Sequence, residues 1–166
     1  MYYDTFQQMK KTLKNLDAWL QKAATYAEAK KIDPAVMLGL RLFPDQLPLA
    51  RQVQIACATA KLAVQRVTGR EVPSIQDTET NFAELRARIE TTLGILEGFD
   101  EKAFEGSATR VVSQPRWEGK TMSGHDYFLE HAIPNFFFHS VTVYAILRHN
   151  GVELGKADYL GKLSLK

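Results

Sequence analysis

The pattern of apolar and polar positions is most regular at the start of the chain, from about Asp4 to Lys31. Apolar side chains recur there every three or four residues, at Phe6, Met9, Leu13, Leu16, Leu20, Ala23 and Ala27. The opposite side is polar, with Lys10, Lys14, Gln21 and Lys22. This spacing predicts a long helix that buries one face. Asp33 as N-cap and Pro34 at the first helical position then predict a short helix through about Leu40.

Two more helical segments follow. The first is predicted to be capped by Asp45 and to run to about Thr68, with Gly69 as its stop. It is rich in alanine, which permits close helix packing, so we expect it to lie centrally. The second spans about residues 78–98 and turns an apolar face inward through Phe82, Leu85, Ile89, Leu93 and Leu96. Its charged side chains are predicted to face solvent, as charged residues mostly do: Arg86, Arg88 and Glu90.

A fourth helix is predicted between Ser123 and Gly151. Ser123 with an acid three residues later forms a capping-box start, and Gly151 follows a cationic last turn. Apolar side chains recur between these ends at helical spacing, at Phe128, Ala132, Phe136, Val143, Ile146 and Leu147. Pro134 lies in the middle of this helix, where it should leave the carbonyl of Glu130 without its partner and kink the axis.

The segment before the fourth helix lacks a helical period. Residues 109–114 and 117–122 predict a small β-hairpin, and Asp100 is predicted to cap a turn within residues 99–106. The tail, residues 152–166, shows no clear periodicity. Four long helices with connections of unequal length predict an all-α fold, a four-helix bundle with a small β-hairpin before the last helix. Unequal connections leave open whether some of them cross over the bundle.

Composition narrows the class of protein without naming a function. The chain is 45% hydrophobic and 24% charged, which is typical of a globular domain. A net charge of +2 is too small to argue for nucleic acid or an anionic membrane as a partner. Cys57 is the only cysteine, so no disulfide forms within the chain, and its alanine neighbours predict a buried, unreactive thiol. With no apolar run of about 20 residues and no signal-peptide pattern, we expect a soluble cytoplasmic protein.

The candidate chemistry lies mainly on the last helix, where Asn135 and His139 are four residues apart beside the buried face. Two histidines at this spacing would form half of a zinc or nickel site, but one position here is an amide. His139 is therefore a satisfied core histidine, a pocket-lining residue or a metal ligand, and all three interpretations stay open. His131, four residues before Asn135, would extend the same stripe.

On the second long helix, Gln54 shares a face with Arg51 and could reach across the bundle. The alternative is that Gln54 is an ordinary polar residue at the rim of the helix. The sequence contains no glycine-rich phosphate loop, no nucleophile elbow and no Glu-x-x-His pair, so it names no reaction.

Three segments together resemble an uncharacterised bacterial family of the DinB/YfiT-like superfamily of predicted metalloenzymes. They are residues 48–56, PLARQVQIA, residues 134–139, PNFFFH, and residues 145–156, AILRHNGVELGK. The resemblance covers essentially the whole chain. It implies that residues 1–166 form a single DinB-like four-helix-bundle domain with up-down-down-up topology, usually packed as a homodimer.

The resemblance also implies where a metal site would lie. Metal-binding members of the superfamily use one histidine on the second helix and two, four residues apart, on the fourth. His139 matches the second of that pair, Asn135 stands at the first, and Gln54 falls near the helix-two position. Two of three ligands are thus amides, so we expect a degenerate metal site with no resident cofactor. The residues predicted to line a cleft for a small polar ligand are Gln54, Asn135, His139, Arg51 and His131.

The alternative is a metal-dependent hydrolase or thiol transferase of the superfamily. Such an enzyme would hold zinc or nickel through His139 with Gln54 or His131, and whether the protein is an enzyme stays open. The chain itself is the expected partner, as a homodimer, because aromatic residues surround the last helix at Tyr127, Phe128, Phe136, Phe137, Phe138 and Tyr144. Trp19 and Tyr26 lie off the main apolar stripe of the first helix, so they are expected in the same interface.

Overall fold

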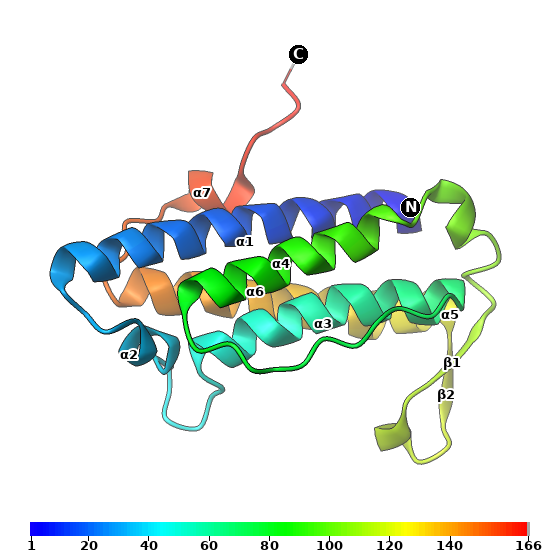
Figure 1. The fold of residues 1–166 in the computed structure, drawn as a ribbon. Coiled ribbons are helices and arrows are strands. Elements are labelled where there is room, and N and C mark those ends of the chain that lie inside the picture. Colours follow the sequence, from blue (N-terminus) through cyan, green and yellow to red (C-terminus); the bar gives the residue numbers. More distant parts are fainter. Residues whose placement is uncertain (166) are drawn as a thin grey trace.

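The computed structural model describes residues 1–165, and four long helices dominate it: α1 (Tyr2–Lys30), α3 (Leu49–Thr68), α4 (Phe82–Glu97) and α6 (Ile133–His149). In Figure 1, α1 and α6 run from the hairpin end of the bundle towards α2, whereas α3 and α4 run the opposite way. α3 packs between α4 and α6, and α1 packs against the same two helices. The predicted up-down-down-up four-helix bundle is confirmed.

Parallel α3 and α4 require a long return connection, which residues 69–81 provide. Gly69 ends α3 with a φ of 74°, a left-handed conformation that glycine adopts without strain. Figure 1 shows the connector running back along the bundle to the start of α4. There the Asn81 side chain accepts from the backbone N–H of Glu84 at 3.0 Å, so α4 begins at Phe82. The predicted start, at about Thr78, was four residues too early.

The first helices follow the predicted pattern with one exception. α1 buries the whole predicted apolar stripe, and Asp33 caps α2 (Pro34–Leu38) by accepting from the N–H of Ala35 at 2.8 Å. The prediction that Asp45 caps the next helix is wrong, because Pro48 holds the N-cap position of α3. The backbone N–H of Leu49 instead donates to the carbonyl of Leu40 at 2.8 Å, which joins the start of α3 to the end of α2.

The predicted fourth helix is an uninterrupted helical segment whose winding changes along its length. It comprises a short turn, α5 (Gly124–Asp126), a π-helical turn, η3 (Tyr127–Ala132), and then α6. Pro134 is the second residue of α6, directly after the π turn. A wider turn accommodates both the missing N–H of proline and the clash of its ring with the preceding turn, so the chain departs from regular α-helix just before Pro134.

A small hairpin precedes this helix, as predicted. β1 (Val111–Ser113) pairs antiparallel with β2 (Thr121–Ser123), and a single turn of helix, η2 (Pro115–Trp117), lies at its tip. Asp100 caps η1 (Glu101–Phe104) by accepting from the N–H of Ala103 at 3.1 Å, also as predicted.

The tail contains a helix that the sequence pattern did not reveal, α7 (Lys156–Leu160), which packs on α1. The indole N–H of Trp19 donates to the carbonyl of Asp158 at 3.0 Å, and the Trp19 ring stacks on Tyr159 at 5.6 Å. Trp19 is therefore buried within its own chain. Its predicted place in a dimer interface is wrong, because α7 already covers it.

Burial follows the predicted faces closely, with one informative error. Arg86 and Glu90 lie toward solvent, but the side chain of Arg88 is only 2% exposed, so its predicted outward position is wrong. Arg88 is buried because the connector supplies carboxylate partners, Asp77 and Glu79. None of the helices within residues 1–165 is both long and apolar enough to cross a membrane.

Candidate functional site

The five predicted site residues do not converge on one cleft. Arg51 and Gln54 lie on the side of α3 that meets the connector before α4. His139 faces the other side of α3 near its start. Asn135 and His131 line a separate cavity further along the same two helices. The structure thus divides the predicted site into three clusters, which differ in whether their polar groups are already satisfied.

The first cluster joins α3 and α4 to the connector. The side-chain N–H of Gln54 donates to Glu79 at 2.8 Å, and its oxygen accepts from Arg51 at 2.6 Å. Arg51 also pairs with Asp77, while Arg88 donates to Asp77 at 2.8 Å and pairs with Glu79. We call this cluster the Arg88 network. Each of its side chains has a partner, so its role is to hold the connector against α3 and α4.

The second cluster is a buried pair, His139 and Gln52. The side-chain N–H of Gln52 donates to the carbonyl of Leu47 at 3.0 Å, which turns the oxygen of the same amide towards His139. Nδ1 of His139, 2.7 Å from that oxygen, must therefore be the donor. Burial lowers the pKa of His139 below its ordinary value, so the ring is neutral near pH 7.

Gln52, rather than Gln54, is thus the α3 residue opposite His139. The sequence contained a usable indication of this, because Gln52 lies on the buried stripe three residues after Leu49 and four before Ala56. A polar residue on an apolar stripe is more informative than one beside it, since burial obliges it to find a partner.

The residues at this place do not fit a zinc or nickel ion. A catalytic zinc normally has three protein ligands drawn from histidine, cysteine or carboxylate. Among the described residues at this place, His139 contributes the one imidazole, and its Nδ1 is engaged by Gln52. Asn135 donates its amide N–H to the hydroxyl of Thr59 at 2.8 Å. Throughout residues 1–165, no group of three or more His, Cys, Asp or Glu side chains is arranged to hold a metal.

The third cluster surrounds a cavity of about 320 Å³ between α3, the π turn with the start of α6, and the hairpin tip. We call it the His131 cavity. Its apolar wall comes mainly from α3, with Ile55, Ala58 and Leu62, and from Pro115. Its polar side chains come from all three elements: Thr59, Arg66, Gln114, Arg116, Tyr127, His131 and Asn135.

Aromatic stacking and cations set the geometry of the His131 cavity. His131 stacks on Tyr127 with ring centroids 5.4 Å apart, and Arg66 donates to the Tyr127 hydroxyl at 2.9 Å. Nε2 of His131 meets the guanidinium of Arg116. Arginine only donates, so Nε2 is the acceptor and the neutral ring carries its proton on Nδ1. Burial, followed by the charges of Arg116 and Arg66, lowers the pKa of His131.

Two residues that line the cavity each carry a buried polar atom without a partner within residues 1–165. These atoms are Nδ1 of His131 and Nε2 of Gln114, whose residue is only 7% exposed. Both atoms are hydrogen-bond donors in the arrangement above. Buried polar groups in folded proteins are nearly always hydrogen-bonded, so two unsatisfied donors on one cavity call for an explanation.

Comparison with known proteins identifies the family of the chain. Residues 1–160 match the model of a family described as "Domain of unknown function (DUF1993)". The chain belongs to the DUF1993 family. It is also similar to a DinB family member protein from Shewanella denitrificans, whose crystal structure was determined at 1.83 Å resolution. The two share 53% sequence identity over 97% of this chain and 92% of that chain, with a TM-score of 0.93. No curated protein matched the sequence.

These matches confirm the resemblance to a DinB-like family that the sequence motifs indicated. The family is named for its lack of an assigned function, so the matches leave the function to be argued from the geometry of the site.

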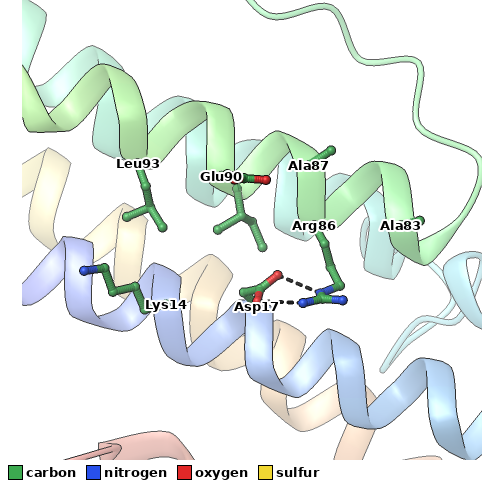
Figure 2. A pocket seen from close by; sticks show the side chains of 8 residues that line it. Lys14, Asp17, Ala83, Arg86, Ala87, Glu90 and Leu93 are labelled. Carbon is green, nitrogen blue, oxygen red and sulfur yellow. Dashed lines mark hydrogen bonds and ion pairs between the residues drawn. The ribbon is translucent and has the colours of Figure 1, made fainter.

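Another hollow of this DUF1993 chain, a groove of about 490 Å³ between α1 and α4, differs from the His131 cavity in the pairing of its charges. Figure 2 shows Arg86 of α4 reaching Asp17 of α1 across this groove through two interactions, the shorter 2.8 Å long. Arg86 of this groove is in an ion pair, whereas within residues 1–165 Arg66 and Arg116 of the His131 cavity are in none.

Sequence reasoning missed five of the seven polar side chains of the His131 cavity: Thr59, Arg66, Gln114, Arg116 and Tyr127. Thr59, Arg66 and Tyr127 are ordinary helix residues by their spacing. Gln114 and Arg116 lie at the tip of a hairpin whose position against η3 no local pattern encodes. A buried glutamine can be recognised only after the hairpin is docked, so this part of the site is visible in the tertiary structure alone.

Proposed function

We propose that this DUF1993 protein binds a small polar ligand, and that the His131 cavity is the binding site. The observation that carries the proposal is the pair of buried, unpartnered donors on the cavity lining, Nδ1 of His131 and Nε2 of Gln114. Neither atom is exposed to solvent, so a ligand with hydrogen-bond acceptors would satisfy both once their side chains rotate towards the cavity. Leaving such groups unsatisfied costs about 1–3 kcal/mol each, and a bound ligand would offset that cost.

The form of the cavity supports the same proposal. Ligand sites are typically concave, about 300–1,000 Å³ in volume, and mostly apolar with a few polar groups that fix orientation. At about 320 Å³, with one apolar wall and polar side chains from three elements, the His131 cavity has these properties. Asn135 and His131 keep their predicted role as ligand-binding residues in this proposal, whereas Arg51, Gln54 and His139 belong to the other two clusters.

A thermal-shift screen of small polar compounds against the wild type and two cavity variants tests the proposal. Gln114→Met removes the unpartnered amide at similar volume, and His131→Phe removes Nδ1 while keeping an aromatic ring to stack on Tyr127. Compounds that raise the melting temperature of the wild type should raise that of either variant much less. Gln76→Met, the same substitution at an exposed position outside the cavity, is the matched control.

Two results would contradict the proposal. In one, no compound stabilises the wild type. In the other, the stabilising compounds act equally on Gln114→Met, His131→Phe and the control, which would place their site elsewhere on the chain.

A further inference from the structure

We infer that the ligand of the His131 cavity is a small organic carboxylate: an anionic head bound by arginine, with a compact apolar body. The inference rests on the proposed function and adds the chemical class of the ligand. Three properties of the cavity lead to it, namely its charge, the direction of its hydrogen bonds and the composition of its wall.

The charge of the cavity lining is positive and uncompensated. Arg66 and Arg116 both contribute to the lining, which contains no aspartate or glutamate within residues 1–165. Neither arginine takes part in an ion pair in that part of the chain, whereas Arg51, Arg86 and Arg88 all do. Two guanidinium groups beside one cavity make an anion the complementary ligand, and their planar forks match the two oxygens of a carboxylate.

The hydrogen bonds available to a ligand are predominantly donors. Nδ1 of His131 and Nε2 of Gln114 are unpartnered donors, covered as the side chains stand, that a small rotation of each side chain would turn towards a ligand. The hydroxyl oxygens of Tyr127 and Thr59 already accept, from Arg66 and Asn135 respectively, so the proton of each hydroxyl is free to be donated. A ligand rich in acceptors and poor in donors is complementary to this set, and an ionised carboxylate is acceptor-only.

The apolar part of the cavity lining argues against a bare inorganic anion as the best occupant. Ile55, Ala58 and Leu62 of α3 with Pro115 of the hairpin form an apolar surface, and a fully hydrated ion would leave it without a partner. An organic body in contact with this surface gains from the hydrophobic effect while its head reaches the arginines. Phenylacetate and hexanoate combine these two properties in small molecules.

Isothermal titration calorimetry with charged and neutral molecules of matched shape tests the inference. The probes are phenylacetate and hexanoate, their amides phenylacetamide and hexanamide, and inorganic phosphate. At least one carboxylate should bind the wild type about tenfold or more tightly than its own amide, since hydrogen bonds to a charged group are worth more than neutral ones. Phosphate should bind more weakly than that carboxylate.

Variants locate the interaction. Arg116 is exposed at the hairpin tip, so Arg116→Gln should fold normally. It should weaken binding of the carboxylate about tenfold and binding of the amide much less, because only the carboxylate loses a charged partner. Arg116→Lys should recover part of the loss, because it restores the charge without the planar fork. Lys120→Gln removes the same charge from the same hairpin outside the cavity lining, and it should leave both affinities unchanged.

The outcomes separate this inference from the proposed function. Equal affinity for carboxylate and amide, with both lost in Gln114→Met, would overturn the carboxylate and leave the polar cavity standing. Phosphate binding as tight as the carboxylate would overturn the organic ligand. Carboxylate binding that is insensitive to Arg116→Gln would overturn the assignment of the anionic head to this cavity. If none of the five probes binds, the inference fails, whereas the proposed function fails only if the wider screen also finds no cavity-dependent compound.

Discussion

Replacing Arg88 with methionine should destabilise the fold by about 3–5 kcal/mol, the range found when one partner of a buried ion pair is removed. The side chains of Arg88 and Glu79 are 2% and 8% exposed, so the substitution leaves the Glu79 carboxylate with little water to replace its partner. It also removes the bond from Arg88 to the carbonyl of Gln76 and the 2.8 Å contact with Asp77. The connector over α3 would thereby lose its main attachment to α4.

Urea denaturation followed by circular dichroism measures this loss as a change in the free energy of unfolding. In thermal melts, a chain of this size shifts by about 2–4 °C per kcal/mol, so the melting temperature should fall by roughly 6–20 °C. Arg86→Met is the matched control, two residues away on the same helix. Its ion pair with Asp17 has side chains 37% and 33% exposed, and such pairs contribute about 0–1 kcal/mol.

The reasoning is refuted if Arg88→Met and Arg86→Met cost the same, or if Arg88→Met costs less than about 1 kcal/mol. A double substitution checks the mechanism as well as the size. If the loss comes from an uncompensated carboxylate at Glu79, then adding Glu79→Gln to Arg88→Met should recover part of it. If the loss came only from a packing defect, the second substitution would add to the damage.

Three further predictions concern His139, Cys57 and the state of assembly. Burial lowers the pKa of His139, so as the pH falls the unfolded chain takes up a proton on this ring before the folded chain does. The free energy of unfolding should therefore be constant above the ordinary histidine pKa of about 6.5. It should fall as the pH drops from there to the lowered pKa of the folded state. His139→Gln should flatten this fall in urea titrations at several pH values, and identical curves for wild type and variant would contradict a buried neutral ring. Burial raises the pKa of the Cys57 thiol to about 12, so a thiol reagent at pH 8 should label the native protein only at the rate of unfolding; prompt stoichiometric labelling would show an accessible thiol. The predicted homodimer should be disrupted by Phe138→Glu, since Phe138 is 57% exposed on α6; light scattering that gives the 18.8 kDa of one chain at every concentration of wild type would rule the dimer out.

The helices were predictable because their evidence is local. The stripe on α1 repeats often enough to determine the face that is buried, and Pro34 and Gly69 mark ends that depend only on backbone conformation. Two of the errors occurred where a distant segment decides the outcome. Trp19 looks like an interface residue until α7, far along the sequence, is folded over it. Arg88 looks like a solvent-facing residue until the connector brings Glu79 against it.

The candidate site, like the helices, was predictable only where the evidence is local in the sequence. Asn135 and His139 were correctly recognised as polar residues on the buried side of the last helix, since the apolar period makes them conspicuous. Each bonds a different residue of α3, Thr59 and Gln52 respectively, and four-residue spacing on one helix cannot specify which. The donors of the His131 cavity were beyond prediction, because Gln114 acquires its environment only when the hairpin tip packs against η3.

The contrast between the Arg88 network and the His131 cavity suggests how the two kinds of buried polar cluster can be told apart. In the network every charged group has a partner, so removing a member should destabilise the fold. On the cavity lining Gln114 and His131 have unpartnered donors within residues 1–165, so removing one relieves a desolvation cost of about 1–3 kcal/mol. Gln114→Met should therefore raise stability where Arg88→Met lowers it. A gain in stability accompanied by a loss of binding is what a group retained for a ligand predicts, and a purely structural glutamine would show neither.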